Sequence, residues 1–209
     1  MDAAAIAFKP VILTGMAGRD ADAIQAVVDG DVERYAELVD KYQRPILRLA
    51  FSLLGNEEDA KDAAQEAFIR AFRALGRFKF QAEFSTWLYR IVVNSCRDAE
   101  ARRRRHAADV VIGTPNEDDS SVLFVDVDDP SIGPGDQLVN RELAAQLSRA
   151  IRRLAAHQRT AFVLHHLEGL SLQEAAQVTG CRVGTVKSHL FRAMDHLRKQ
   201  LKPFVTEEA

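Results

Sequence analysis

The sequence is poor in cysteine: it holds two in 209 residues, Cys96 and Cys181, which lie far apart along the chain. Two distant cysteines make neither a disulfide framework nor a thiolate metal cluster, and a reducing cytoplasm is the compartment that we expect. Long hydrophobic runs are also missing, since no stretch approaches the ~20 consecutive apolar residues that a membrane span requires. The stretch 1–16 has no basic leader and is interrupted by Lys9 and Pro10, so no signal peptide is expected.

Segments that alternate between apolar and polar residues are scarce, and "VLFVDV" at 122–127 is the longest. A β-sheet is therefore not expected, whereas helical periodicity is common elsewhere. The predicted fold class is all-α, with two small helical domains joined by an acidic flexible linker. The domain boundaries that we predict are a tail at 1–20, a first domain at 21–106, the linker at 107–137, a second domain at 138–203 and a tail at 204–209.

The sequence also lacks the residue spacings of an enzyme. It has no phosphate-binding loop. His165 and His166 are neighbours on one helix and so diverge, while His157 stands eight residues before the first of them. No enzyme activity, metal, cofactor or small-molecule substrate is therefore expected, and the histidines are interpreted as packing or surface residues.

Charge is unevenly distributed, although the net charge is only −2. Residues 107–137 carry eight acidic and no basic side chains, and they are rich in Pro, Gly and Ser, which is typical of a linker. Residues 138–202 carry eleven basic and four acidic side chains. A basic block favours a polyanion as partner, and a solvated surface is the alternative.

In the first domain, Gly55 ends one helix and Asn56 begins the next, whose first turn is acidic. Small and apolar residues recur along this second helix at helical spacing and predict its buried stripe. Asp62, Gln65 and Glu66 crowd one exposed side of the same helix. Either they form a tolerated solvated face, or they meet a basic partner.

A further helix is predicted from Ser85, which we expect to cap it, to His106. Trp87 and its apolar neighbours at helical spacing supply the buried side. The helix ends in four consecutive arginines, Arg102 to Arg105, which exceed what a helix C-terminus needs. Nucleic-acid phosphate is the partner that this run favours.

The second domain contains a helix-turn-helix pattern. Ser171 and Glu174 have the spacing of a capping box, and Gly180 makes the turn after a short helix. The long helix that follows, about 183–201, has an apolar stripe that includes Val186, Leu190 and Leu197 and predicts its buried face. The residues on its outward side, or beside it, are free to enter a major groove: Arg182, Thr185, Lys187, Ser188, Phe191 and Arg192.

Three motifs resemble the extracytoplasmic-function type of sigma factor in the sigma-70 family. They are "DAAQEAFIRAFRAL" at 62–75, "FSTWLYRIVVNSCRD" at 84–98, and the helix-turn-helix from His157 to Leu197. The resemblance implies that Asp62, Gln65 and Glu66 dock on core RNA polymerase. It further implies that the helix-turn-helix reads duplex −35 DNA. The loop "FKFQAEF" and the helix after it would capture the −10 strand through Phe80, Gln81, Phe84, Asn94, Arg97, Arg102 and Arg103.

The partners implied by this resemblance are core RNA polymerase and promoter DNA, and an anti-sigma factor is left open as a third. Phe84 could equally belong to the core. We further expect the acidic linker to follow basic channels of the polymerase, with a passive spacer as the alternative. A stand-alone helix-turn-helix transcriptional regulator is the alternative function. It would explain the second domain, but it would leave the acidic helix face and "FSTWLYRI" without a role.

Overall fold

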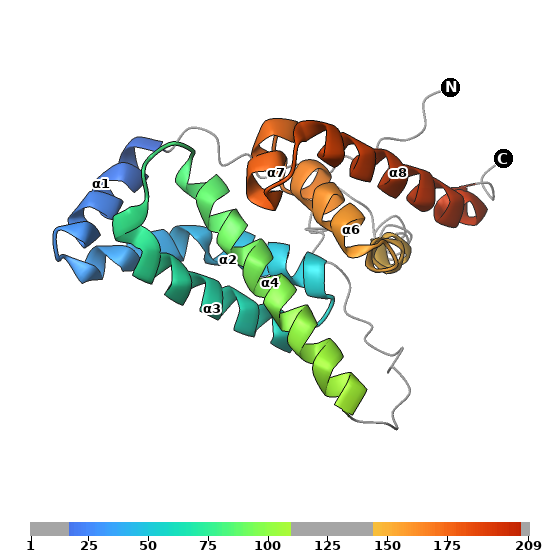
Figure 1. The fold of residues 1–209 in the computed structure, drawn as a ribbon, viewed down its shortest axis with the longest axis horizontal. Coiled ribbons are helices and arrows are strands. Elements are labelled where there is room, and N and C mark those ends of the chain that lie inside the picture. Colours follow the sequence, from blue (N-terminus) through green and yellow to red (C-terminus); the bar gives the residue numbers. More distant parts are fainter. Residues whose placement is uncertain (1–16, 110–143, 206–209) are drawn as a thin grey trace, which may run out of the picture.

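The computed structural model describes residues 17–109 and 144–205, and every regular element within these two ranges is helical (Figure 1). The first range contains, in chain order, α1 (Ala17–Val28), η1 (Val32–Arg34), α2 (Tyr35–Leu54), α3 (Glu57–Ala74), η2 (Leu75–Arg77) and α4 (Phe84–Asp109). The second contains a helix over residues 144–152, then α6 (Ala156–Phe162), the π-helical turn η3 (Val163–Leu167), α7 (Leu172–Thr179) and α8 (Val183–Val205). The prediction of an all-α chain with two helical domains is confirmed.

Local capping explains where several of these helices begin and end. The side chain of Asn56 accepts a hydrogen bond of 2.9 Å from the backbone of Asp59, and Gly55 ends α2 in the left-handed conformation, with φ of 71°. Ser171 and Glu174 form the predicted capping box. Ser85 does not cap α4, because that helix already begins at Phe84 and Ser85 therefore lies within its first turn.

The core of the first domain lies between α2, α3 and α4 (Figure 1). Aliphatic side chains of α2 and α4, such as Leu49 and Leu88, are fully buried there. The face that α3 contributes consists of alanines: Ala60, Ala63, Ala64, Ala67 and Ala71. Since an alanine row brings no long side chain into the interface, α3 can approach its neighbours closely, and its polar residues face outward.

The second domain packs α8 against α6 and α7. Val186, Leu190, Ala193 and Leu197 are buried along one side of α8, so the predicted stripe is confirmed. Gly180 makes the turn between α7 and α8 with φ of 69°, and its amide donates to the carbonyl of Ala176. Such a conformation favours glycine, because a Cβ would be strained there.

The two domains are in contact rather than separate. α4 packs against α7, and α2 contacts both α6 and η3. Buried residues of both domains join into one continuous hydrophobic cluster. Domains that meet through a small or polar interface move readily relative to one another, whereas a shared apolar interface favours one arrangement.

Residues 110–137 of the predicted linker, and residues 1–16 and 206–209 of the predicted tails, lie outside the described residues. α1 begins at Ala17, four residues before the boundary expected for the first domain, and Asp20 is buried. α4 continues to Asp109, three residues past the boundary expected for the first domain. The second domain's last helix likewise continues to Val205. Within the two described ranges, no helix has the length and apolar character needed to cross a membrane.

Candidate functional site

The acidic face of α3 points away from the core. Asp62 and Gln65 are exposed and Glu66 is half-exposed, because the alanine stripe occupies the opposite side of the helix. Glu66 accepts a hydrogen bond of 2.8 Å from Arg70, which also donates one of 2.7 Å to Asp98 of α4. These two carboxylates, Asp98 first, raise the pKa of Arg70. Asp62 has no ion-pair partner among the described residues, so its charge is available to another molecule.

Two large apolar side chains extend this face. Ile69 and Phe72 are exposed, one and two turns beyond Gln65 at helical spacing. The ring of Phe72 rests edge-on against Tyr35, with 5.0 Å between ring centroids. Sequence reasoning missed both residues, although their spacing from the acidic positions could have indicated them. The face is therefore acidic at one end and apolar at the other, which suits protein more than nucleic acid.

The loop between η2 and α4 presents Phe80 to solvent. Phe80 is 52% exposed and adopts a positive φ of 53°, a conformation that is uncommon for residues other than glycine and costs energy. Its ring lies 4.8 Å from that of Phe78, measured between centroids. Phe84 lies below them, only 4% exposed, and contacts the ring of Trp87. The structure therefore places Phe84 in the core, where its ring cannot meet a base, and its candidate role is limited to supporting the loop.

A groove of about 400 Å³ runs beside this loop. Gln81, one of the predicted residues, lines it, together with Trp87 and Thr86 of α4. Three basic side chains that sequence reasoning missed also border it: Arg77, Lys79 and Arg90. The groove thus combines an aromatic wall with cationic groups, the combination that binds single-stranded nucleic acid by stacking and phosphate contact. Gln177 of α7, in the second domain, closes one side.

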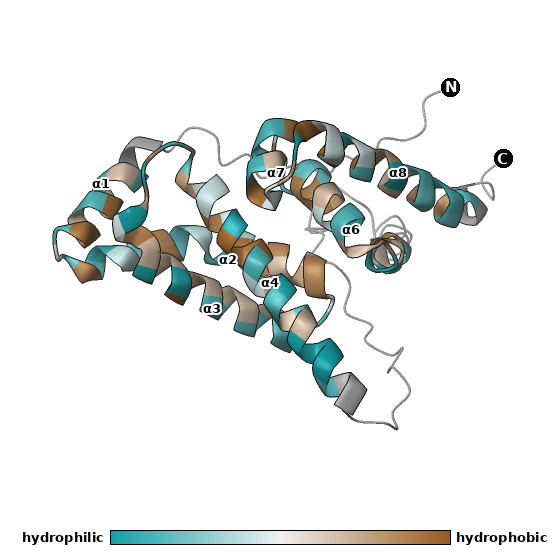
Figure 2. Cartoon of the chain, in the orientation of Figure 1, coloured by the Kyte–Doolittle hydropathy of each residue, from teal (hydrophilic) through white to brown (hydrophobic). Residues whose placement is uncertain are grey.

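The remaining α4 candidates are spread along the helix. Asn94 is exposed and Arg97 is half-exposed near its middle. Arg102 and Arg103 lie in the hydrophilic C-terminal part (Figure 2), roughly 27–29 Å from the start of the helix at roughly 1.5 Å per residue. Arg103 pairs with Asp59 at 3.3 Å, and since both side chains are exposed the pair contributes little. The structure therefore does not gather the seven candidates into one site. Phe80 and Gln81 lie in the loop before α4 and Phe84 is in the core, and the other four follow α4 as a track.

The outward side of α8 carries the other set of candidates. Thr185, Lys187, Ser188 and Arg192 are exposed, and Phe191 is 77% exposed. Arg182 is exposed in the turn before the helix. Ser188 donates to the carbonyl of Gly184 at 3.0 Å, which leaves the oxygen of its hydroxyl free to accept a further hydrogen bond. These candidates do share one surface, on the helix that follows the capped turn.

Two histidines lie next to that surface. The rings of His157 and His189 stack with centroids 5.7 Å apart. Burial, followed by the charges of His157 and Arg192, lowers the pKa of His189 below its usual value. The ring is therefore neutral at pH 7. No cluster of His, Cys, Asp and Glu side chains able to hold a metal ion occurs within the described ranges.

Comparison with known families gives two matches. Residues 38–106 match sigma-70 region 2, and residues 144–197 match sigma-70 region 4. The first match contains α3, the aromatic loop and most of α4, and the second contains the helix-turn-helix.

Relatives in several bacteria cover nearly the whole chain. The RNA polymerase sigma-H factor of Pseudomonas aeruginosa is 35% identical over 191 residues, which span 90% of this chain and 97% of that protein. SigW of Bacillus subtilis, an ECF RNA polymerase sigma factor, is 36% identical over 184 residues. These residues span 86% of this chain and 95% of SigW.

Among solved structures, RpoE of Bartonella quintana in complex with the anti-sigma factor NepR aligns with a TM-score of 0.61 and 26% identity. That alignment covers 79% of this chain and 97% of the other. CnrH, in complex with the cytosolic domain of CnrY, has the same fold, with a TM-score of 0.62 and 23% identity. That alignment covers 88% of this chain and 98% of CnrH. These matches, on a chain with an acidic α3 face and a helix-turn-helix, show that it belongs to the sigma-70 family as an extracytoplasmic-function sigma factor, a protein of transcription initiation.

Proposed function

We propose that this sigma factor works in the cytoplasm, without enzymatic activity of its own, through three surfaces. The α3 face binds core RNA polymerase, the aromatic loop and α4 capture the −10 strand, and α8 reads the −35 duplex. No cofactor, metal or small-molecule substrate takes part. Each surface is assigned from the chemistry that its side chains offer.

The α3 face suits a basic protein surface. Asp62 and Gln65 are free to form polar contacts, while Glu66 is already held by Arg70. Ile69 and Phe72 supply apolar area beside them. Interfaces draw most of their affinity from a few apolar or aromatic anchors surrounded by polar contacts. Asp62 would therefore set orientation and rate of encounter, and Phe72 would contribute affinity.

The groove next to Trp87 suits an unstacked base. A flipped or single-stranded base gains from stacking on an aromatic ring, and Phe80 and Trp87 are the rings that the loop and the helix offer. Arg77, Lys79 and Arg90 would neutralise the flanking phosphates. Further along α4, Asn94, Arg97, Arg102 and Arg103 would continue this track of polar and basic groups.

The exposed side of α8 suits a major groove. Thr185, Ser188 and Arg192 would face base edges, since residues near the N-terminal half of a recognition helix reach them. Lys187 and Arg182 would meet phosphates, and Phe191 would cover a thymine methyl group or a sugar. Phosphate contacts fix the register of the helix, and base contacts give sequence preference.

The observation that carries the proposal is the acidic and partly apolar face of α3, present in the same chain as the helix-turn-helix. A stand-alone transcriptional regulator needs the helix-turn-helix but has no use for the α3 face. The two functions therefore differ in one measurable property, which is stable binding to core RNA polymerase.

Size-exclusion chromatography with purified core RNA polymerase tests this difference. The parent chain should co-elute with the core enzyme, whereas Asp62→Arg should not, because the new arginine would be repelled by the basic partner surface within the interface. The change leaves the core of the domain untouched, since Asp62 is exposed. Asp22→Arg on α1 is the matched control, since Asp22 is also an exposed carboxylate and receives the same change. Failure of the parent to co-elute would favour the stand-alone regulator, and co-elution of Asp62→Arg would reject the docking surface.

An anti-sigma factor is the further partner that we propose. RpoE of Bartonella quintana was solved with one, and its structure resembles this chain over 97% of its length. Such a partner would have to compete with core polymerase for this chain. Adding it to the preformed complex should therefore release the sigma factor, and a ternary complex on the column would contradict the proposal.

A further inference from the structure

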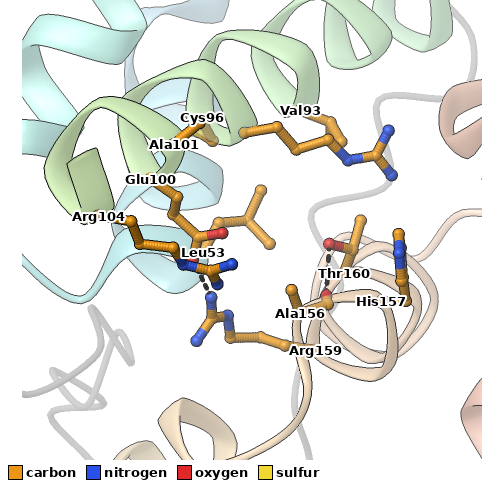
Figure 3. A pocket seen from close by; sticks show the side chains of 11 residues that line it. Leu53, Val93, Cys96, Glu100, Ala101, Arg104, Ala156, His157, Arg159 and Thr160 are labelled. Carbon is orange, nitrogen blue, oxygen red and sulfur yellow. Dashed lines mark hydrogen bonds and ion pairs between the residues drawn. The ribbon is translucent and has the colours of Figure 1, made fainter. Parts of the chain in front are cut away.

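A cavity of about 210 Å³ lies where α4 of the first domain meets α6 of the second. Figure 3 shows Glu100 and Arg104 on the α4 side, with His157 and Arg159 on the α6 side. The apolar part of its lining consists of Leu53, Val93, Cys96, Ala101 and Ala156. Pockets for drug-sized ligands have volumes of about 300–1,000 Å³, so this cavity suits a smaller ligand.

Positive side chains outnumber negative ones in this cavity. Arg97, Arg104 and Arg159 line it, whereas Glu100 is the one carboxylate among the described residues around it. Glu100 is already paired with Arg159, and both side chains are mostly buried. Neither Arg97 nor Arg104 forms an ion pair with another described residue. Two positive charges of the lining are therefore unmatched, and like charges around one small space repel each other.

Arg159 also has a donor that the fold does not use. Its Nη1 atom donates to the backbone carbonyl of Arg152 at 3.2 Å, and its Nη2 atom donates to Glu100. Its Nε atom is buried and has no hydrogen-bond partner among the described residues. A buried donor without an acceptor is unfavourable. An acceptor oxygen that reached this atom from the cavity would remove that cost.

A second charged contact between the domains is balanced, in contrast to the cavity. The side chain of Glu168, directly after η3, has an exposed fraction of 0%. It accepts hydrogen bonds of 3.2 and 3.1 Å from the Nε and Nη2 atoms of Arg48 in α2, and one of 3.2 Å from the hydroxyl of Tyr89 in α4. That carboxylate has both an opposite charge and full hydrogen bonding, as a buried ion requires. The excess of positive charge is therefore a property of the cavity itself.

We propose that the cavity binds a phosphate group, held by the guanidinium groups of Arg97 and Arg104 and by the Nε atom of Arg159. A phosphate group carries a charge of about −1.5 to −2 at pH 7, which matches the two unpaired arginines. The planar guanidinium group binds phosphate oxygens through two parallel hydrogen bonds. The ligand is either the free ion or a small phosphorylated molecule, since both offer the same oxygens. The site goes beyond the three surfaces proposed above and does not depend on their roles.

A native thiol reports on binding. Cys96 is buried and lines the cavity, and burial raises the pKa of its thiol to about 12. In a Cys181→Ser background, an uncharged disulfide reagent labels Cys96 alone. Inorganic phosphate at about ten times its Kd should slow this labelling about tenfold, because only the chain without phosphate reacts. At the same concentration it should raise the melting temperature by about 3–6 °C.

The decisive variant is Arg104→Gln, because Arg104 is exposed and its replacement leaves the core of the domain untouched. It should weaken phosphate binding by about tenfold or more, since a charge-assisted hydrogen bond is lost. The double change with Arg97→Gln should abolish the protection of Cys96. Arg105→Gln is the matched control, since Arg105 is an exposed neighbour that does not line the cavity. It should leave the Kd unchanged, and sodium chloride at equal ionic strength should not protect Cys96.

Glycerol phosphate in the same assay distinguishes the two sources of the ligand. Tighter binding than inorganic phosphate would assign the site to a phosphorylated small molecule, and weaker binding would assign it to the free ion. The expected Kd of the better ligand is about 1 mM or tighter, so failure of both to protect Cys96 at about 10 mM would overturn the proposal. An equal loss of binding in Arg104→Gln and Arg105→Gln would also overturn it, since net charge would then explain the effect. Protection by a short DNA single strand but by neither phosphate compound would assign these arginines to nucleic acid instead and reject the small ligand.

Discussion

Replacement of Arg192 by alanine separates a side chain that reads DNA from one that holds the fold. Arg192 lies on the exposed side of α8, opposite the buried Val186 and Leu190. Among the described residues it forms no hydrogen bond or ion pair, so its loss removes no contact of the folded chain. The expected change in the free energy of unfolding is within about 0.5 kcal/mol.

The effect on DNA binding should be much larger. A side chain that pairs with a guanine edge contributes about 1–3 kcal/mol, which corresponds to a loss of roughly 5- to 150-fold in affinity for the preferred −35 sequence. Binding to unrelated duplexes should change little, so the ratio between preferred and unrelated sequences should fall. Lys187→Ala gives the contrasting pattern, because a phosphate contact carries no sequence information. It should weaken binding to all duplexes evenly and reduce the slope of log affinity against log salt by about 1.

Fluorescence anisotropy with two duplexes measures both effects. One duplex carries the −35 sequence enriched from a random library by the parent chain, and the other carries a scrambled sequence of the same length. Titrations at several salt concentrations give the slope, and a thermal melt gives stability. The reasoning is refuted if Arg192→Ala unfolds the second domain, or if preference and affinity both survive the change.

Three further predictions concern stability. Leu190→Ala should lower the free energy of unfolding by about 2–5 kcal/mol, because Leu190 is buried. Phe191→Ala should change the free energy of unfolding by less than about 0.5 kcal/mol, because Phe191 is exposed. Equal effects of the two changes in urea denaturation would contradict this difference in burial. The pKa of His189 is lowered in the folded state, so the unfolded chain takes up a proton there more readily than the folded chain. Stability should therefore fall as the pH drops below the ordinary histidine pKa of about 6.5, and His189→Asn should flatten the pH dependence of the melting temperature. Asn56→Ala removes the cap of α3 and should cost about 1 kcal/mol in the same assay, while a neutral result would mean that the cap is replaced by water.

Local features of the structure could be predicted from the sequence because they depend on residues a few positions apart. The capping box of Ser171 and Glu174, the turn at Gly180 and the buried stripe of α8 are of this kind. Each is a short pattern with one stable geometry. The exposure of Asp62 and Gln65 also follows from the alanine stripe of α3, which is visible in the sequence.

Features that join distant segments could not be predicted in the same way. Glu168 stands 120 residues from Arg48, and nothing near it in the sequence indicates that its carboxylate is buried. Phe84 belongs to an aromatic loop that could face either way, and only its packing under Trp87 places it in the core. The sequence likewise did not indicate that Arg90 lines the groove beside the loop, because Arg90 belongs to α4 and reaches the groove only through the packing of that helix against the loop.

Run-off transcription with purified core RNA polymerase measures what a sigma factor does. A library of templates with randomised −35 and −10 positions would be transcribed with the core enzyme alone and with the core enzyme plus the parent chain, and the transcripts sequenced. Addition of the chain should enrich a small set of templates that share one −35 and one −10 sequence, and Asp62→Arg should abolish the enrichment. The same transcript distribution with and without the chain would contradict its role as a sigma factor.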